Sequence, residues 1–386
     1  MRRIAILIEY PTVNGGENSM LAVLKHLLDK GVPDYGIEFC ILGPSTGPMA
    51  QRVAELEIPF VELSLFGSDG VRLPREEAIS RLLDAADRSG AHLVHGNSLA
   101  MGRLLGAASR QDASFVSTSH LRDIMKLSRA AISDLNANRK LIAVSEATLQ
   151  FHINQGLDAS VGSVIHNGID VDDFAADASA GKRIRAEFGI TDDVIVLLTV
   201  GQIGLRKGLD TLAEAGQRLT KMRPGIHWLL AGERFSQKSE SLEYEANVLS
   251  TFSSCEPELK LHRLGYRDDI PALMQAADVL VHGARQEPLG RVLLEAAASG
   301  LAIVATDVGG TTEILTNRES ALLVPPGSAQ SVAEAVADFI DHAELRARLA
   351  GAAKTKVRCD FGISRAAEEL ISVWRSVLSA EGRHDV

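Results

Sequence analysis

The sequence predicts an α/β protein with two parallel-sheet domains, and three observations support this prediction. Apolar strand-like runs alternate with helical segments from residue 4 onward, which is the order that builds parallel sheets. A polar, alanine-rich stretch at 172–182 interrupts the alternation, which restarts with a clean apolar strand at 194–200. A length of 386 residues also provides enough chain for two separate cores. We therefore place a domain boundary between residues 171 and 172.

Composition and charge narrow the class of protein. A hydrophobic share of 46% with only 4% aromatic residues suits an α/β protein rich in Ala, Leu and Val, and no apolar run approaches the roughly 20 residues of a membrane span. The segment MRRIAILIEYP lacks a small-residue cleavage site after its apolar run, so it predicts a first buried strand rather than a signal peptide. Cys40, Cys255 and Cys359 are too widely spaced for a disulfide framework or a cysteine metal site. A net charge of -10 disfavours nonspecific nucleic-acid binding, and we expect a cytoplasmic protein.

In the first half, polar residues and glycines follow several predicted strands. The strands are predicted at Ile4–Glu9, Glu38–Leu42, Pro59–Leu63, Leu93–His95, Phe115–Thr118, Leu141–Ser145 and Val161–His166. Gly15 and Gly16 precede a helix, where a backbone can approach a ligand and the helix start favours an anion, although a plain tight turn explains them equally well. Asn97 and Ser98 end another strand. His120 ends a third, and a lone histidine is more often structural than catalytic.

In the second half, one loop carries adjacent basic residues between glycines. Strands are predicted at Val194–Val200, Ile226–Ala231, Leu259–Leu264, Ala277–Val281, Ala302–Thr306 and Ala321–Val324. The loop after the first of them, GQIGLRKG, places Arg206 and Lys207 where they can clamp a diphosphate, Arg by forked hydrogen bonds and Lys by its point charge. As a bare pair they would more often be solvated surface charges. The spacing fits neither a GxGxxG fingerprint nor a Walker A loop, which weakens dinucleotide and ATP-binding interpretations.

The stretch 279–314 carries two glutamates eight residues apart, Glu287 and Glu295. On one continuous helix that spacing would leave them about 80° out of line. If Glu287 instead lies on the preceding loop, both carboxylates can converge above the helix N-terminus, where carboxylates fix sugar hydroxyls and free N–H groups hold phosphate oxygens. Taken alone, both residues would be read as solvated helix-end charges.

Several segments together resemble the retaining family 4 glycosyltransferases of the GT-B fold. EPLGRVLLEAAASG followed by TDVGGTTEI resembles the E-x7-E region of that family, and VGQIGLRKGLDTL resembles its diphosphate-binding segment. VSTSHLRD, IAVSEAT and NGID resemble three elements of its N-terminal half and domain crossover. The resemblance implies two Rossmann-like domains facing a cleft. Residues 1–171 would bind the acceptor, residues 172–364 would bind the nucleotide sugar, and a C-terminal helix at 365–386 would cross back onto the first domain.

The resemblance also implies roles for individual residues. For the donor it implies diphosphate contacts from Gly15, Gly16, Gly201, Arg206 and Lys207; base contacts from Gly265, Tyr266 and Arg267; and a ribose contact from Glu295. The transferred sugar would be held by Glu287 and by the amides of Leu289 and Gly290, with His120 at its reacting face. Catalysis would rest on His120, Glu287, Arg206 and Lys207. Asn97, Ser98 and Asn167 would lie on the acceptor side. Tyr266 either stacks on the base or merely packs.

Two short segments depart from the family pattern. His282-Gly283 replaces the usual Pro-Ser, and Pro288-Leu289 replaces the common Gly-Phe. Pro288 has no amide to donate, so only the Leu289 and Gly290 N–H groups remain for sugar hydroxyls. We expect activity to be retained and the sugar preference to shift.

The prediction is therefore a retaining, metal-independent glycosyltransferase that uses a nucleoside diphosphate sugar and no cofactor. Asp170 and Asp172 formally fit a D-x-D metal pattern, but they lie at the domain crossover and the family generally needs no metal. A sugar epimerase, a phosphorylase and a catalytically silent nucleotide-sugar-binding scaffold are the alternatives, although no pyridoxal-binding lysine segment is present. Residues 121–140 predict an ordinary surface helix, with docking on the inner face of a membrane as the less favoured reading. The acceptor, sugar, nucleotide and oligomeric state are left open.

Overall fold

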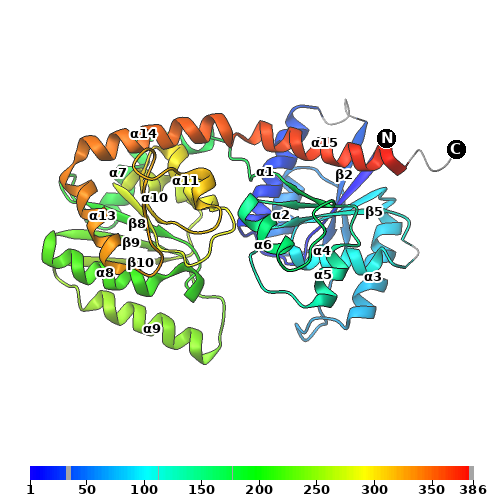
Figure 1. Cartoon of the computed structure of the whole chain (residues 1–386), viewed down its shortest axis with the longest axis horizontal. Coiled ribbons are helices and arrows are strands. Elements are labelled where there is room, and N and C mark those ends of the chain that lie inside the picture. Colours follow the sequence, from blue (N-terminus) through cyan, green and yellow to red (C-terminus); the bar gives the residue numbers. More distant parts are fainter. Residues whose placement is uncertain (32–35, 112, 176, 382–386) are drawn as a thin grey trace. The chain divides into compact units, whose positions relative to one another are not determined.

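The computed structural model describes residues 1–31, 36–111, 113–175 and 177–381, and the chain divides into two compact units. The first unit comprises Met1–Ile169 with Ile363–Val386, and the second comprises Asp170–Gly362 (Figure 1). The sequence placed the boundary two residues later, after 171. Of the predicted C-terminal helix 365–386, residues 382–386 lie outside the described part of the chain.

The first unit is built on a seven-stranded sheet whose ladders are all parallel. Its strands are β1 Arg2–Leu7, β2 Ile37–Gly43, β3 Phe60–Glu62, β4 Leu93–Gly96, β5 Val116–Leu121, β6 Lys140–Ala143 and β7 Gly162–Val164. They lie in the order β3-β2-β1-β4-β5-β6-β7. The chain leaves β1 in one direction to reach β2 and returns to its other side as β4. The loops that follow β1 and β4 therefore border a topological switch point, where ligands of such sheets bind.

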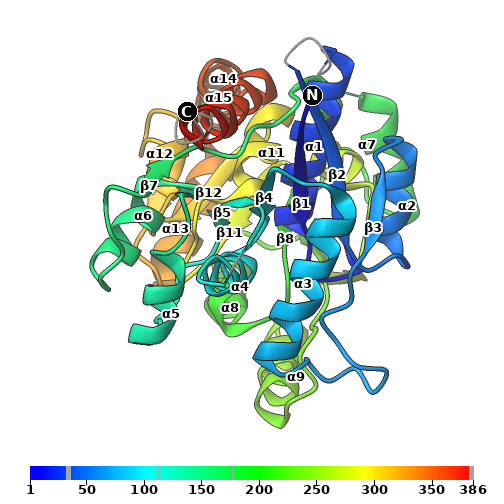
Figure 2. The ribbon, with the colours of Figure 1, turned by 90° about the vertical axis from the view of Figure 1, so that its right-hand side faces the viewer.

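Helices cover both faces of this sheet, which explains the unbroken apolar run of its first strand. The helices are α1 Gly15–Asp29, α2 Pro48–Glu55, α3 Arg75–Ser89, α4 Leu99–Ala108, α5 Arg129–Leu135, α6 Glu146–Ile153 and α15 Ile363–Glu381. Ile4 and Ile6 belong to a core shared with α1 and α15, whereas Ala5 and Leu7 belong to a core shared with α3 and α4. A strand buried on both sides needs apolar residues at successive positions. Figure 2 shows α3 and α4 on the opposite face of the sheet from α15.

The last helix, α15, belongs to the core of the first unit although it follows the whole second unit in the sequence. Ala366, Leu370 and Trp374 recur at helical spacing and are buried, and they pack in the same core as α1. The Trp374 ring meets Phe39 edge-on, with 5.8 Å between ring centroids. The Ile363 N–H donates to the Ile169 carbonyl at 3.0 Å, which ties the start of the helix to the end of the first segment.

The predicted helix over 121–140 is wrong. Strand β5 continues through Leu121, and residues 122–128 form no regular element before the short helix α5. Ser128 starts α5 by accepting a hydrogen bond from the Ala131 N–H at 3.2 Å, and Lys140 already belongs to β6. The charges that suggested a membrane-docking helix are therefore distributed over a strand end, a loop and two further elements. No helix among the described residues combines the length and apolarity needed to cross a bilayer.

The second unit repeats the design with a six-stranded parallel sheet in the order β10-β9-β8-β11-β12-β13. Its strands are β8 Val196–Val200, β9 Ile226–Ala231, β10 Leu259–Gly265, β11 Val279–His282, β12 Ala302–Thr306 and β13 Leu322–Val324. Its helices are α7 Ala178–Glu187, α8 Leu209–Met222, α9 Ser239–Ser253, α10 Ile270–Ala276, α11 Arg291–Ser299, α12 Thr311–Ile314, α13 Ala329–Asp341 and α14 Ala343–Asp360, with 3-10 turns η2 Asp172–Phe174 and η3 Leu205–Lys207. Two Rossmann-like parallel-sheet domains, as predicted, are thus confirmed.

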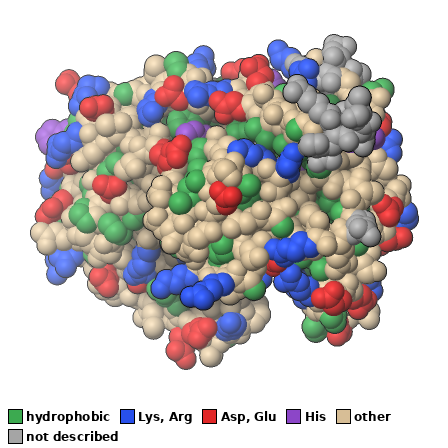
Figure 3. Space-filling view, turned by 45° about the vertical axis from the view of Figure 1, so that its right-hand side comes forward, with side chains coloured by type: hydrophobic (Ala, Val, Ile, Leu, Met, Phe, Trp, Pro, Cys, Tyr) green, Lys and Arg blue, Asp and Glu red, His purple; other side chains and the backbone are tan. Residues whose placement is uncertain are grey.

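The second sheet also has a switch point, between β8 and β11. One core cluster of the unit contains Trp228 and Phe252, whose rings meet edge-on at 5.2 Å between centroids. The loops after β8 and β11 contain, respectively, the basic pair and the first glutamate singled out in the sequence. On the face drawn in Figure 3, acidic and basic side chains are interspersed rather than gathered by sign.

Candidate functional site

Lys207 and Glu287 meet where the β8 and β11 loops run together in the second unit. The Lys207 Nζ lies 2.6 Å from Glu287 Oε2, and His282 Nε2 lies 2.8 Å from the same oxygen. Because a carboxylate oxygen only accepts, His282 donates its Nε2–H to it. The side chains of Lys207 and Glu287 are only 17% and 8% exposed. The three residues therefore form one compact, largely buried cluster at the switch point.

The cluster holds Glu287 in its charged form. Burial alone would raise the pKa of Glu287, but the Lys207 ammonium and the hydrogen bond from His282 outweigh burial and leave the pKa lowered. The pKa of His282 is lowered by burial and by the charge of Lys207, so its imidazole is neutral at neutral pH. His282 occupies a position where the family pattern has a different residue. Its hydrogen bond here stabilises the ionised carboxylate of Glu287.

Glycines and one arginine bring the two loops close enough for this cluster. Gly208 has φ of 62°, and a Cβ on it would lie 2.0 Å from the carbonyl oxygen of Gly283. Gly309 has φ of 52°, and a Cβ there would lie 2.0 Å from the carbonyl oxygen of Glu287. Only glycine fits either position without moving the backbone. Arg285 also joins the two loops. Its backbone N–H donates to the Arg206 carbonyl at 2.8 Å, and its side-chain Nη1 donates to the Leu205 carbonyl at 2.9 Å.

Glu295 lies on α11, one helix turn beyond Arg291, and the two form an ion pair. Arg291 Nε donates to Glu295 Oε1 at 2.7 Å. Burial raises the pKa of Glu295, and Arg291 offsets this effect only in part. Glu287, by contrast, lies on the loop before the helix, as the sequence argument required. The two carboxylates are thus held by different cations, Lys207 and Arg291.

The backbone before α11 offers donors at a helix start. Gly290 has φ of 107° and precedes the first helical residue, and Leu289 is buried beside it. The first N–H groups of an α-helix have no partner within the helix, so this end can hold an anion or an oxygen-rich ligand. The carbonyl of Glu287 accepts a hydrogen bond from the Gly310 N–H at 3.0 Å, which attaches the loop before α11 to the segment after β12.

The remaining donor-binding candidates of this unit lie along the same carboxyl edge. The Gly201 N–H donates to the Ala231 carbonyl at 2.9 Å, and the Gly232 N–H to the Gly265 carbonyl at 2.7 Å, which links the ends of β8, β9 and β10. Tyr266 leaves 68% of its surface exposed. Arg267 instead forms ion pairs with Asp269 at 2.6 Å and Glu187 at 2.9 Å. Arg267 thus already has two carboxylate partners.

In the first unit, Arg122 joins the polar residues that end three neighbouring segments. Its Nη1 donates to Asn167 Oδ1 at 2.7 Å, and its Nη2 donates to Asn97 Oδ1 at 3.0 Å. Asn97 in turn donates from Nδ2 to the Gly16 carbonyl at 3.2 Å. The sequence prediction assigned Arg122 to a surface helix and missed this role. Its position two residues after His120, directly beyond the end of the same strand, was the available signal.

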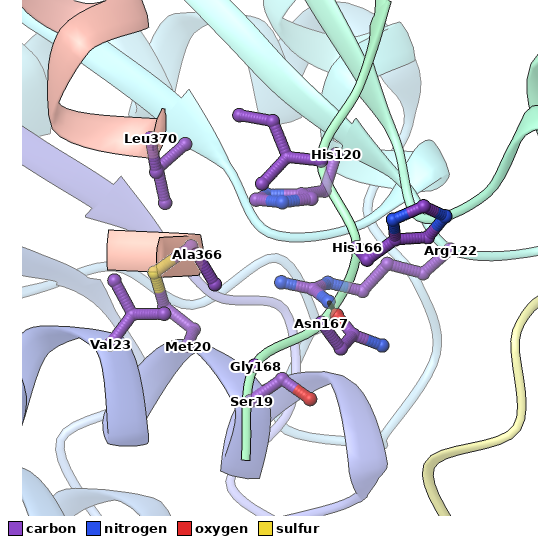
Figure 4. A pocket seen from close by; sticks show the side chains of 11 residues that line it. Ser19, Met20, Val23, His120, Arg122, His166, Asn167, Gly168, Ala366 and Leu370 are labelled. Carbon is purple, nitrogen blue, oxygen red and sulfur yellow. Dashed lines mark hydrogen bonds between the residues drawn. The ribbon is translucent and has the colours of Figure 1, made fainter. Parts of the chain in front are cut away.

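His120, Arg122 and Asn167 line a small hollow in the first unit (Figure 4). The hollow has a volume of about 10 Å³, room for roughly one water molecule. His120 is 4% exposed, and burial, followed by the charge of Arg122 and the neighbouring His95 ring, lowers its pKa. Ser19 and Met20 of α1 and Leu370 of α15 also contribute to the walls.

Three positions singled out in the sequence, Ser98, Asp170 and Gly15, have a local structural use. Ser98 Oγ accepts the Met101 N–H at 3.2 Å and so caps α4. Asp170 Oδ1 accepts the Asp172 N–H at 3.1 Å, a turn within the D-x-D segment. Gly15 is the first residue of α1, behind an Asn14 capping box. Within the described residues, no three His, Cys, Asp or Glu side chains gather in a way that would hold a metal ion.

Curated relatives resemble this chain over one or both units. A putative glycosyltransferase of Bacillus subtilis, YtcC, is 24% identical over 325 residues, which cover 81% of this chain and 79% of the relative. The lipopolysaccharide core biosynthesis glycosyltransferase LpsE of Rhizobium meliloti is 31% identical over 43% of this chain, and that match spans only 45% of LpsE. Among solved structures, Anabaena HepE in complex with UDP-glucose has a TM-score of 0.83 at 21% identity, covering 97% of this chain and 100% of that one.

Family models match both units. The model for glycosyl transferases group 1 matches residues 181–356, and the model for glycosyltransferase family 4 matches residues 13–173. The two matches fall on the second and first units respectively, so nearly all of the chain is accounted for. Together with the two Rossmann-like sheets, this places the chain among the GT-B glycosyltransferases.

Proposed function

We propose that this glycosyltransferase moves a sugar from a nucleoside diphosphate donor, bound by the second unit, to an acceptor bound by the first, with retention of anomeric configuration. The observation that carries the proposal is the buried cluster of Lys207, Glu287 and His282 at the switch point of the second sheet. A cation and an anion held together, beside a helix start, match the two ends of a sugar diphosphate.

In this mechanism, Arg206 and Lys207 neutralise the departing diphosphate. Arg206 is exposed at the loop tip and Lys207 lies deeper, so they can reach opposite sides of the same group. Stabilising the charge that develops on the leaving group is the largest contribution we ask of the protein, about 3–4 kcal/mol for each well-placed donor. Because these cations and a helix start supply that charge, we propose that no metal ion is required.

Glu287 and the amides of Leu289 and Gly290 hold the sugar, and Glu295 holds the ribose. His120 contacts the reacting sugar, while Asn97 and Asn167 contribute to acceptor binding. The different environments of the two glutamates support these separate roles in sugar and ribose binding. Glu287 is kept ionised by Lys207 and His282, whereas the pKa of Glu295 is raised. An anionic Glu287 is a strong acceptor for sugar hydroxyls.

The test is a thermal-shift screen of the parent protein against UDP-, GDP- and ADP-sugars. A ligand at 100 times its dissociation constant adds about 2.7 kcal/mol of stability to the domain that binds it. UDP-glucose is the first donor to try, because HepE was solved with it. A screen in which no nucleotide sugar raises the melting temperature, with the protein folded, would refute the donor class. A scaffold would bind a donor but release no sugar to any acceptor.

A further inference from the structure

A buried series of hydrogen bonds runs from helix α15 to His120. Trp374 Nε1 donates to His95 Nδ1 at 3.2 Å, and His95 Nε2 lies 2.7 Å from His120 Nδ1. Thr118 Oγ1 also lies 2.8 Å from His95 Nδ1. These four side chains belong to residues that are each at most 4% exposed, and all of them lie in the first unit. Neither His95 nor Trp374 was assigned a functional role from the sequence.

This series of hydrogen bonds has a fixed direction, because the Trp374 indole at one end can only donate. An indole N–H has no acceptor capacity, so His95 Nδ1 must accept the bond from Trp374. Burial, followed by the charge of Arg122, lowers the pKa of His95 to about 3, and its ring is therefore neutral at neutral pH. A neutral imidazole carries a single proton. In His95 that proton lies on Nε2.

The same reasoning fixes the next ring. His95 Nε2–H donates to His120 Nδ1, which must then accept. His120 is also neutral, since burial, Arg122 and His95 all lower its pKa. Its single proton therefore lies on Nε2. A second proton on Nδ1 would place two N–H groups against each other at 2.7 Å, so this series of hydrogen bonds opposes the imidazolium form as well.

We propose that Trp374 is a positioning residue that, through His95, locks His120 as the Nε2–H tautomer, so that His120 serves as a hydrogen-bond donor to the ligand and not as a base. The role of His120 toward a sugar rests on the proposed function; its tautomer does not. A donor at this place suits a hydroxyl or ring oxygen of the reacting sugar, which accepts a hydrogen bond. A base would require the proton on the other nitrogen.

Thr118 provides the contrast that makes the proposal testable. A hydroxyl can donate or accept, so Thr118 follows whichever tautomer His95 adopts. With the indole removed, Thr118 can accept from a His95 Nδ1–H, and both histidines are then free to reverse their tautomers. With Thr118 removed, the indole still requires His95 Nδ1 to accept. Trp374→Phe should therefore release His120, whereas Thr118→Val should not.

The experiment is long-range proton–nitrogen NMR of the full-length protein labelled with nitrogen-15, which distinguishes protonated from unprotonated ring nitrogens. The signals of His120 are assigned by their loss in His120→Gln. At neutral pH we expect the parent and Thr118→Val to show the Nε2–H pattern for His120, and Trp374→Phe to show a shift toward the average of both tautomers. Trp228→Phe is the matched control, because it removes another buried indole N–H, which donates to Thr199 Oγ1 at 3.0 Å in the second unit.

An Nδ1–H or imidazolium pattern for His120 in the parent would overturn the proposal. So would a shift in Thr118→Val, or an unchanged pattern in a folded Trp374→Phe. If Trp374→Phe does not fold, the parent and Thr118→Val spectra still test the tautomer of His120 and its independence of Thr118. No sugar donor or acceptor enters these measurements, so failure of the proposed transfer reaction and failure of the tautomer assignment are separate results. Once substrates are known, Trp374→Phe should lower kcat and leave nucleoside diphosphate affinity at the parent value.

Discussion

Replacing Glu287 with glutamine separates the two roles that we propose for Lys207 and Glu287, which form an ion pair. Glutamine keeps the size of the side chain and removes its charge. In the parent, Lys207 Nζ gives one of its hydrogen bonds to Glu287 Oε2 at 2.6 Å. In Glu287→Gln the ammonium keeps its position but loses its neutralising partner. We expect nucleoside diphosphate to bind at least as tightly as in the parent, while sugar transfer falls.

The magnitudes follow from the burial of the pair. Its side chains are 17% and 8% exposed, so the charge-assisted bond is worth about 1–1.5 kcal/mol more than a neutral one. Removing this competitor for Lys207 should tighten diphosphate binding by at most about tenfold. Transfer should fall by about a hundredfold, because a sugar displaced by roughly 1 Å loses its reactive geometry. Binding and turnover thus move in opposite directions.

The assay is calorimetric titration with nucleoside diphosphate, together with initial transfer rates for the parent and the variant. Asp278→Asn is the matched control. Its ion pair with Arg185 is similarly buried, with side chains 23% and 13% exposed, but it lies just before β11, at the opposite end of that strand from Glu287. The control should change neither diphosphate affinity nor rate. Transfer at the parent rate by Glu287→Gln would refute our assignment of Glu287 to the sugar.

Four further outcomes are expected. Arg206→Ala and Lys207→Ala should each weaken diphosphate binding by about 1.5–3 kcal/mol in calorimetry. Only Lys207→Ala should also lower the melting temperature, because breaking a buried ion pair costs about 3–5 kcal/mol. Equal melting temperatures of the two variants would contradict this expectation. Glu295→Ala should weaken nucleoside diphosphate and intact donor alike, by about 1.5–3 kcal/mol, so an effect on one ligand alone would exclude the ribose contact. Turnover should survive EDTA, and a complete loss restored by magnesium or manganese would contradict metal independence. The pKa of Glu287 is lowered in the folded protein, so its ionised form stabilises the fold above the ordinary glutamate pKa of about 4.3. This stabilisation is lost as the pH falls toward the pKa of the folded state. The melting temperature of the parent should therefore decline below about pH 4.3 more steeply than that of Glu287→Gln.

The fold was predictable from the sequence because its signals are local. Unbroken apolar strands such as 194–200 and glycine-flanked loops after them specify buried parallel sheets from a few neighbouring residues. Glu287 lies on a loop ahead of a helix, which is the position that the sequence argument required for the two carboxylates to converge. The helix predicted over 121–140 was too long, because only α5, Arg129–Leu135, is helical. Before α5, Arg122 bonds to Asn97 and Asn167 and the Leu127 N–H donates to Gln155 Oε1, so distant partners replace the helical contacts there.

The partnerships within the site could not be predicted, because they join residues far apart in the chain. Lys207 and Glu287 were each singled out, but their bond spans 80 positions and depends on two strands lying side by side. The bond from Trp374 to His95 spans 279 positions. His282 had been only a departure from a family pattern, and its purpose emerges from its bond to Glu287. Spacing in the sequence carries no information about such distances.

The return of α15 to the first unit has a consequence for the order in which a ribosome can complete the protein. Residues 1–169 leave the ribosome first, yet the core that contains Ile6, Met20 and Phe39 also requires Trp374. At about 5–20 residues per second, the whole second unit takes on the order of 10–40 s to be made while that core is still open. The core of the first unit can therefore be completed only after the second unit has been synthesised. We expect a chain released at residue 362 to bind a dye for exposed apolar surface, and the intact chain not to do so.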